Sequence, residues 1–149
     1  MTPRGLRNNN PLNIEKTKGG NPWRGEIVPS KDSRFAQFTT MAYGYRAAFK
    51  LLNNYQRNYG LDTIRKMIGR WAPSNENHTD AYVRTVAERS GVPVDSRITA
   101  TNRDVMVPIV AAMSFVENGV EAKMSDVQAG GELFINCLLY TSPSPRDRG

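Results

Sequence analysis

The sequence changes character near residue 40, and this change constrains the fold more than any other feature. Residues 1–40 are rich in Asn, Gly and Pro and show no helical repeat of apolar side chains. After Thr40, apolar residues recur at alternating intervals of four and three, a spacing that places them on one face of an α-helix. We therefore expect a small lobe without long helices, followed by a helical body.

Local signals divide both parts into elements. In the first part, residues 23–28 and 34–38 have the composition of short strands, and residues 29–33 have that of a turn between them. In the second part, capping residues and helix breakers predict helices at about 40–59, 62–71, 79–90, 101–118 and, incompletely, 125–136. Pro108 should kink the fourth helix or delay its start. The predicted class is α+β and mostly α, with a small β-hairpin lobe before a bundle of four to five helices.

The composition fits one globular domain and argues against several kinds of chemistry. A chain of 149 residues with 39% hydrophobic and 23% charged residues can bury a core, and no apolar run approaches the roughly 20 residues that span a membrane. The start lacks the apolar stretch of a secretory signal. One His and one Cys are too few for a typical zinc site, so we expect no metal and no cofactor. The net charge of +6 comes from scattered basic residues, which disfavours nucleic acid as a partner.

The last residues have a separate interpretation. Residues 137–149 read CLLYTSPSPRDRG, which resembles the in-frame translation of a transposon adaptor used to prepare sequencing libraries. The alternative is a natural flexible tail rich in Pro and Ser. We interpret residues 1–136 as a single domain that is truncated at its C-terminus, and residues 137–149 as disordered, adaptor-derived sequence.

The Asn-rich opening carries a resemblance to a known family. Residues 4–14 read Arg-Gly-Leu-Arg-Asn-Asn-Asn-Pro-Leu-Asn-Ile, which resembles the phage signature Arg-Gly-Ile-Arg-Asn-Asn-Asn-Pro-Gly-Asn-Ile. Leu12 stands where the signature has Gly. The family is labelled structural protein P5-like and is described as virion-associated and related to a murein-degrading protein of enveloped double-stranded RNA phages. The likeness covers nearly all of residues 4–136 and implies a lysozyme-like domain, at 1–136, that acts on peptidoglycan.

A second likeness has the same implication. Bacterial glucosaminidases and lysozyme-like enzymes carry an Asn-Asn-x-x-x-Ile segment, a Trp-x-Gly strand, a Phe-containing strand and then a helix. This chain keeps that order at Asn9, Asn10, Ile14, Trp23, Gly25 and Phe38. Those enzymes place the catalytic Glu at the end of a helix before the Asn segment, whereas the Asn run begins here at residue 8.

The candidate catalytic residues are Glu117, Glu15 and Glu26. Glycoside cleavage needs a carboxylic acid that protonates the leaving oxygen. Glu117 ends an apolar helix and resembles the helix-ending Glu of lytic transglycosylases and goose-type lysozymes, so we expect it to be the acid in a permuted arrangement. The alternative is a solvated Glu beside an Asn-Gly cap. Glu15 or Glu26 would then supply a second, stabilising or water-orienting carboxylate.

The candidate substrate-binding residues lie in the first part of the chain: Asn8, Asn9, Asn10, Asn13, Trp23 and Arg7. Asn amides suit acetamido and hydroxyl groups, although Asn also tolerates tight turns. Trp23 could stack on a sugar ring or pack beneath the small sheet, and Arg7 could bind wall carboxylates or remain solvated. Trp71 follows the apolar face of its helix and is interpreted as core.

Three functions stay open at this point. The leading hypothesis is a phage peptidoglycan hydrolase that cleaves the glycan through Glu117, with a murein endopeptidase as the alternative for the scissile bond. The second is a non-catalytic virion component that binds murein, and the third is a nucleic-acid-binding protein. For the leading hypothesis we expect peptidoglycan and other virion proteins as partners. Its location would be the virion, or the host cytoplasm before release, with action at the cell wall.

Overall fold

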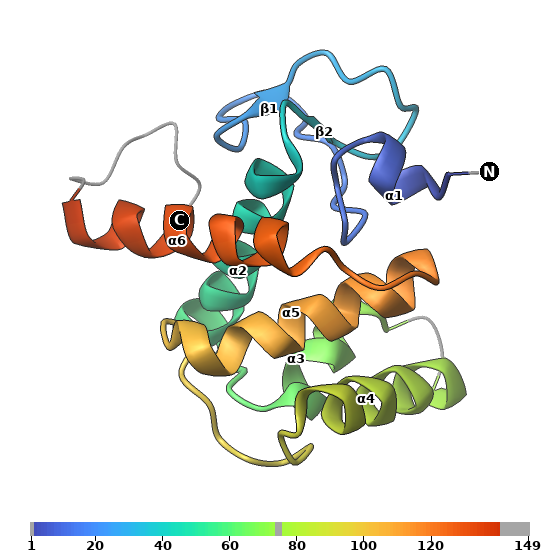
Figure 1. Cartoon of the computed structure of the whole chain (residues 1–149), viewed down its shortest axis with the longest axis vertical. Coiled ribbons are helices and arrows are strands. Elements are labelled where there is room, and N and C mark those ends of the chain that lie inside the picture. Colours follow the sequence, from blue (N-terminus) through green and yellow to red (C-terminus); the bar gives the residue numbers. More distant parts are fainter. Residues whose placement is uncertain (1, 74–75, 141–149) are drawn as a thin grey trace.

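The computed structural model describes residues 2–73 and 76–140, and it confirms a mostly helical chain with a small antiparallel sheet near the N-terminus (Figure 1). In chain order the elements are α1 (Arg4–Arg7), β1 (Glu26–Ile27), β2 (Gln37–Phe38), α2 (Met41–Tyr59), α3 (Ile64–Trp71), α4 (Glu76–Ser90), α5 (Arg103–Asn118) and α6 (Met124–Tyr140). Figure 1 shows α1 and the strands at one end of the molecule and α3 and α4 at the other. Within the described ranges no helix is both long and apolar enough to cross a bilayer.

The sheet is smaller than the strand-like segments predicted. Glu26 pairs with Phe38 and Ile27 with Gln37, and the ladder ends there. Pro29 follows two residues after β1 and has no N–H to donate, which limits the strand in that direction. Beyond this ladder, Glu15 and Phe35 form an isolated antiparallel bridge, and side chains hold the rest of the loops.

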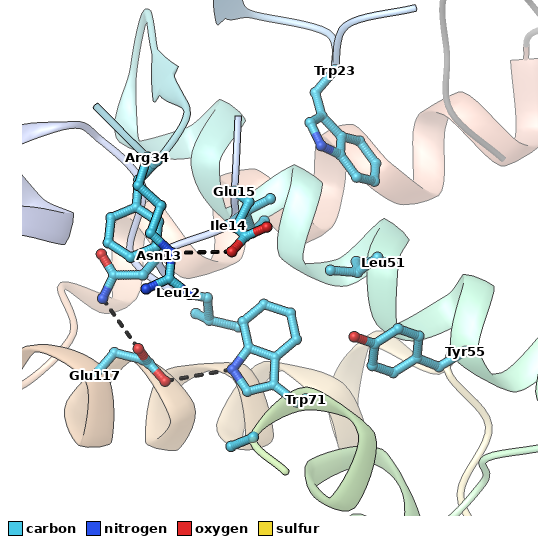
Figure 2. Close-up of a pocket in the computed structure, with 12 residues that line it drawn as sticks. Leu12, Asn13, Ile14, Glu15, Trp23, Arg34, Leu51, Tyr55, Trp71 and Glu117 are labelled. Carbon is cyan, nitrogen blue, oxygen red and sulfur yellow. Dashed lines mark hydrogen bonds and ion pairs between the residues drawn. The ribbon is translucent and has the colours of Figure 1, made fainter. Parts of the chain in front are cut away.

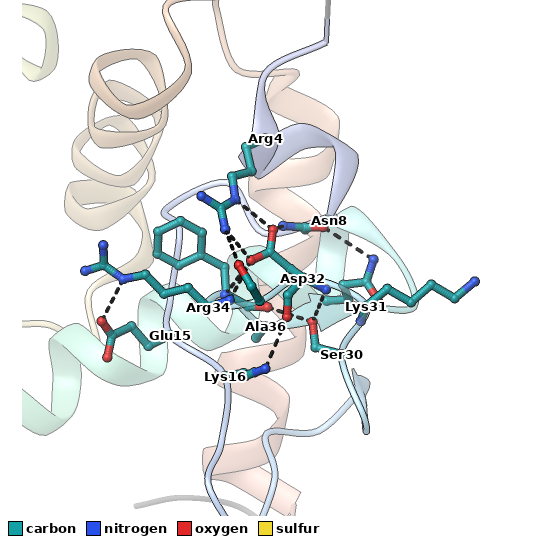
Figure 3. A network of polar contacts seen from close by, with 12 residues as sticks. Arg4, Asn8, Glu15, Lys16, Ser30, Lys31, Asp32, Arg34 and Ala36 are labelled. Atoms are coloured by element: carbon teal, nitrogen blue, oxygen red, sulfur yellow. Dashed lines mark hydrogen bonds and ion pairs between the residues drawn. The ribbon is translucent and has the colours of Figure 1, made fainter.

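The carboxylate of Asp32 holds the turn between the strands against α1 (Figure 3). Its oxygens accept hydrogen bonds from Arg4 Nε at 2.7 Å and Nη2 at 2.6 Å, from Asn8 Nδ2 at 3.0 Å, and from the N–H groups of Arg34 and Phe35 at 2.8 Å each. We call these five residues the Asp32 cluster. The Arg4 guanidinium, followed by the Phe35 N–H, holds the pKa of the Asp32 carboxyl well below its usual value. The single-turn helix α1 was not predicted, because four residues are too few to show a periodicity.

The termini of α2 and α5 follow the signals in the sequence. Thr40 accepts a hydrogen bond at Oγ1 from the N–H of Tyr43 at 3.2 Å, as an N-terminal cap does. Gly60 and Gly119 end α2 and α5 in the left-handed conformation, with φ of 66° and 71°. The predicted ends of these two helices are therefore confirmed.

Two other helices differ from the expected boundaries. Helix α4 begins at Glu76, before Thr79, which lies inside the helix and donates from Oγ1 to the carbonyl of Ala72 at 2.5 Å. Pro108 lies inside α5, and it does not delay the start of this helix at Arg103. The missing N–H of Pro108 falls within two turns of the N-terminus, where a helix tolerates it more easily than at its centre.

Helices α2 and α6 approach each other closely because α6 has Gly130 at the crossing. A Cβ atom at this position would lie 2.4 Å from Tyr45 Cβ and 2.9 Å from both the Ala42 carbonyl and the Arg46 nitrogen. Beyond the crossing, the rings of Phe49 and Phe134 stack with centroids 6.3 Å apart. The centre of the core is thus the interface of these two helices.

Helix α6 continues past residue 136, where the domain was expected to end. It runs to Tyr140, and Cys137 is buried with its Sγ at 3.4 Å from Arg46 Nη2. The part of the expected tail that precedes residue 141 is therefore helical rather than disordered. Residues 141–149 lie outside the described residues, and the adaptor origin of 137–149 stays a prediction.

Candidate active site

The lobe and the helical body meet around a cavity of about 490 Å³ (Figure 2). One side is formed by the Asn-rich segment and the hairpin, at 12–15, 23 and 34–35. The other side is formed by residues 51 and 55 of α2, by residue 71 of α3 and the following residue 72, and by residue 117 at the end of α5. We call this cavity the junction pocket. Its lining combines aromatic rings with carboxylate, amide and guanidinium groups, a mixture that suits a ring-shaped polar ligand.

Glu117 lies in the junction pocket at the end of α5, with both carboxylate oxygens engaged. Oε1 accepts a hydrogen bond from Asn13 Nδ2 at 3.1 Å, and Oε2 accepts one from the Tyr82 hydroxyl at 3.0 Å. Trp71 Nε1 adds a longer contact to Oε2 at 3.4 Å. Figure 2 shows Asn13 and Trp71 on two sides of this carboxylate. Glu117 is half-buried, so it is not the fully solvated helix-end residue of the alternative interpretation.

Tyr82 supports Glu117 from the buried side of the site. Burial raises the pKa of the Tyr82 phenol well above its usual value, and the nearby charge of Glu117 raises it further. The hydroxyl therefore keeps its proton at neutral pH and remains a hydrogen-bond donor to the carboxylate. This donor fixes the carboxylate without placing a positive charge beside it.

Asn13 reaches Glu117 because the Asn-rich segment is tied to α5. Asn118 donates from Nδ2 to the carbonyl of Pro11 at 2.8 Å and to the carbonyl of Ser114 at 3.0 Å. Asn13 itself has a φ of 54°, a left-handed conformation that Asn adopts more readily than most residues. Leu12 has no positive φ and is fully buried, so Leu is accommodated where the phage signature has Gly.

The other three predicted asparagines hold the backbone and are not part of the pocket lining. Asn8 binds Asp32, and Asn9 donates to the carbonyl of Phe38 at 3.1 Å. Asn10 donates to the carbonyls of Ile14 and Ala36 at 2.8 and 2.9 Å and accepts from the Ile14 N–H at 2.9 Å. A short amide side chain can satisfy a turn in this way, which is the structural role that the sequence left open.

The two remaining carboxylate candidates have different surroundings. Glu15 lines the junction pocket, with 61% of its side chain exposed and an ion pair to Arg34 Nε at 3.0 Å. Glu26 is not a lining residue, because its oxygens hold the loop before β1. They accept from Thr17 N at 3.0 Å, Thr17 Oγ1 at 2.6 Å and Trp23 N at 2.9 Å. The structure therefore brings Glu15, but not Glu26, to the site of Glu117.

Of the predicted aromatic and basic residues, one lies at the junction pocket and the other does not. Trp23 lines the junction pocket but is only 4% exposed, so most of its ring packs in the lobe. Arg7 is exposed and does not line the pocket. The described residues contain no group of three or more His, Cys, Asp or Glu side chains that could hold a metal ion.

Sequence reasoning missed three aromatic residues of the site, Trp71, Tyr55 and Tyr82. Trp71 was interpreted as core, but it is half-buried, lines the pocket and contacts Glu117. All three occupy positions that a helical repeat cannot distinguish from core positions. One signal was available for the tyrosines, because a buried hydroxyl requires a polar partner that a Leu or Phe would not.

Comparison with known proteins identifies relatives of the chain. No family model matches it. The chain is 42% identical over 117 residues to Protein P5 of Pseudoalteromonas phage PM2, and the alignment covers 78% of this chain and 71% of that protein. The match confirms the relationship of the chain to a phage protein P5, while the lysozyme-like relationship stays a prediction. The chain belongs to the family of Protein P5 of phage PM2.

Proposed function

We propose that this protein cleaves the glycan strand of peptidoglycan and that Glu117 donates the proton to the leaving oxygen. The observation that carries the proposal is the position of Glu117. It lies at a pocket of about 490 Å³ beside Asn13 and Trp71, and no ion pair joins it to a cation within the described ranges. A carboxyl group that lines a pocket and is not held in an ion pair is available to a ligand there as a proton donor.

Glu15 is the candidate for the second carboxylate. It lines the same pocket from the lobe side, and its exposure gives it access to water. Glycosidases pair a proton donor with a carboxylate that attacks the sugar, activates a water molecule or stabilises the positive charge of the transition state. Arg34 Nε, at 3.0 Å from Glu15 Oε1, holds this carboxylate in position at the pocket.

The pocket walls support a sugar substrate. Trp71 and Tyr55 offer aromatic faces, and the Asn13 amide nitrogen, which donates to Glu117, is a further donor for acetamido and hydroxyl oxygens. Relationship to a phage protein supports peptidoglycan over other glycans, because a phage has to pass the host wall. In this proposal the protein acts at the wall, from the virion or after release from the host cytoplasm, beside other virion proteins.

The test is to identify the fragments that the full 149-residue chain releases from purified peptidoglycan. Mass spectrometry separates the possible bonds: anhydro-muramic ends indicate transglycosylation, reducing ends indicate hydrolysis, and free stem peptides indicate an endopeptidase. We expect glycan ends, and we expect Glu117→Gln to remove them. Glu132→Gln is the matched control, because Glu132 is an exposed carboxylate of α6 outside the junction pocket.

Three results would replace this proposal. Glycan release that survives Glu117→Gln would move the proton donor elsewhere, and release of stem peptides would change the reaction to peptide cleavage. If the chain binds peptidoglycan and releases nothing, the non-catalytic role in the virion is correct.

A further inference from the structure

A row of stacked side chains leads out of the junction pocket along α2 and α3. It begins with Trp71 and Tyr55, which both line the pocket with ring centroids 6.4 Å apart. It continues with Arg70, whose guanidinium carbon lies 5.4 Å from the centroid of Tyr55 and 3.9 Å from that of Tyr59. We call Trp71, Tyr55, Arg70 and Tyr59 the aromatic ladder.

The outer end of the aromatic ladder lies beyond the pocket and faces solvent. Tyr59 is 57% exposed and is not a lining residue of the pocket. It follows Tyr55 by four positions on α2, so the two rings lie on the same side of the helix, one turn apart. A ligand confined to the junction pocket would not reach Tyr59.

Arg70 keeps its hydrogen-bonding capacity available. No ion pair joins Arg70 to a carboxylate in the part of the chain that the structure describes, and the guanidinium is exposed. A guanidinium that rests on aromatic rings is held in orientation while its N–H groups remain free to bind oxygen atoms at its edge. The ladder thus alternates ring faces with donors for hydroxyl, acetamido or carboxylate groups.

We infer that the aromatic ladder is a second binding subsite, which holds the continuation of a polysaccharide strand whose reacting unit occupies the junction pocket. Sugar rings present apolar C–H faces that stack on aromatic rings, and their oxygens accept hydrogen bonds from guanidinium groups. The inference rests on the proposed function, because it takes the pocket as a sugar site. It specifies that the ligand is a polymer rather than a short oligosaccharide.

Single-stranded nucleic acid is the other polymer that binds aromatic and arginine side chains in a row. The junction pocket disfavours it, because Glu117 and Glu15 carry carboxylates at the inner end of the ladder. These groups repel phosphate, whereas they can bind sugar hydroxyls.

The test measures binding in the full chain carrying Glu117→Gln, so that the ligand is not consumed. The probes are insoluble peptidoglycan sacculi, a soluble N-acetylglucosamine disaccharide that is short enough for the pocket alone, and single-stranded DNA for the competing assignment. We expect Tyr59→Ala to weaken binding to sacculi about fivefold, the effect of losing one aromatic contact, and to leave disaccharide binding unchanged. Tyr59→Phe should restore binding to sacculi, because it keeps the ring. Arg70→Gln, on α3, should also weaken binding to sacculi. Arg57→Gln, on α2, removes the same charge outside the ladder and is its control for net charge.

The outcomes separate this inference from the proposed function. The subsite inference is wrong if Tyr59→Ala binds sacculi as tightly as the Glu117→Gln protein that carries it, or if it weakens binding to both sugar probes equally. It is also wrong if the Glu117→Gln protein does not bind sacculi. Ladder variants that lose only single-stranded DNA binding would assign the surface to nucleic acid instead. If Tyr59→Ala weakens binding to sacculi but the wild-type chain releases no fragments, the ladder stands and the catalytic proposal fails.

Discussion

The Asp32 cluster and the surroundings of Glu117 are two carboxylate centres with different environments. Asp32 accepts hydrogen bonds from the charged Arg4 and from backbone N–H groups, and these contacts link one turn to one short helix. Glu117 accepts only from neutral side chains, which come from three separate parts of the chain. Asp32 also lies outside the junction pocket, whereas Glu117 lines it.

The comparison shows that the number of hydrogen bonds to a carboxylate does not distinguish a structural group from a candidate catalytic one. Access to the cavity does, since Glu26 also accepts only from neutral donors but does not line the junction pocket. A cationic partner fixes Asp32 as an anion, and this suits a group that holds two segments together. Neutral donors orient Glu117 without an ion pair, and the pocket gives a ligand access to its carboxylate.

The largest expected effect comes from neutralising each carboxylate separately. Glu117→Gln should lower the rate of glycan release by about a hundredfold or more, because the amide cannot donate a proton as an acid does. It should lower the Tm less than Asp32→Asn does, because the amide nitrogen cannot accept one of the hydrogen bonds from Asn13 and Tyr82 but the amide oxygen keeps the other and no ion pair is lost. Asp32→Asn should do the opposite. It should lower the Tm by several degrees, because Arg4 loses its ion pair, and preserve the rate per folded molecule.

Thermal unfolding and a rate assay on the same preparations decide this prediction. A large loss of stability in Glu117→Gln would mean that the two centres share a structural role. The comparison between them would then be incorrect.

Two asparagines of the same segment extend the comparison to smaller effects. Asn10 is fully buried and makes three hydrogen bonds to backbone groups, so Asn10→Ala should lower the free energy of unfolding by about 2–4 kcal/mol.

Asn13→Gly should lower glycan release by about tenfold with little change in stability, because it removes the donor to Glu117. Glycine is the suitable replacement, since it adopts the positive φ of Asn13 without strain.

Urea denaturation measures the first effect and the fragment assay the second. If Asn13→Gly unfolds as easily as Asn10→Ala, the amide of Asn13 is structural. The Asn-rich segment would then contribute no side chain to the chemistry.

These asparagines also illustrate what the sequence could and could not predict. Four Asn residues within six positions indicate turns and polar contacts equally. Only the hydrogen bond between Asn118 and the Pro11 carbonyl places Asn13 as the one that faces Glu117. That contact joins residues 107 positions apart, and no local pattern encodes it. The helices were predictable for the opposite reason, because caps such as Thr40 and the apolar repeat act within a few residues.

The candidate site was predictable only in part. The end of an apolar helix indicated Glu117, because a helix end is a local feature. Trp71 packs against the core as expected, but its place in the pocket was missed, because the apolar face of α3 continues from the core into the pocket without any change in residue type. Glu26 was indistinguishable from Glu15 until the loop that it holds was known.

A smaller effect is expected from removing a single hydroxyl group near Glu117. Tyr82→Phe should lower glycan release about fivefold, because Oε2 loses its shorter hydrogen bond. Tyr45→Phe is the matched control, since it removes a buried hydroxyl that contacts Ser114 at 2.9 Å in the core. Each variant should lose about 1 kcal/mol of stability, but only the first should lose activity. Equal rates for the two variants would mean that Tyr82 does not position the carboxylate.

The smallest effect is the pH dependence of the Asp32 contribution to stability. The pKa of Asp32 is lowered in the folded protein, first by Arg4 and then by the Phe35 N–H, relative to the value of about 3.9 for an unfolded chain. The folded state therefore binds fewer protons at this group than the unfolded state does. The stabilisation is fully present above the unfolded pKa and decreases as the pH falls toward the folded one.

The difference in Tm between the wild type and Asp32→Asn should accordingly be constant from about pH 7 to pH 5 and should shrink below about pH 4. Comparing two proteins isolates Asp32, because every other carboxylate titrates in both. For example, the pKa of Asp62 is lowered mainly by Arg97, and its contribution to the pH dependence is the same in both proteins and cancels in the difference. Calorimetric scans between pH 7 and pH 2.5 measure the effect. A difference that stays constant to the lowest pH would mean that the shape of the Asp32 side chain, rather than its charge, holds the turn to α1, and the contrast with Glu117 would lose its electrostatic basis.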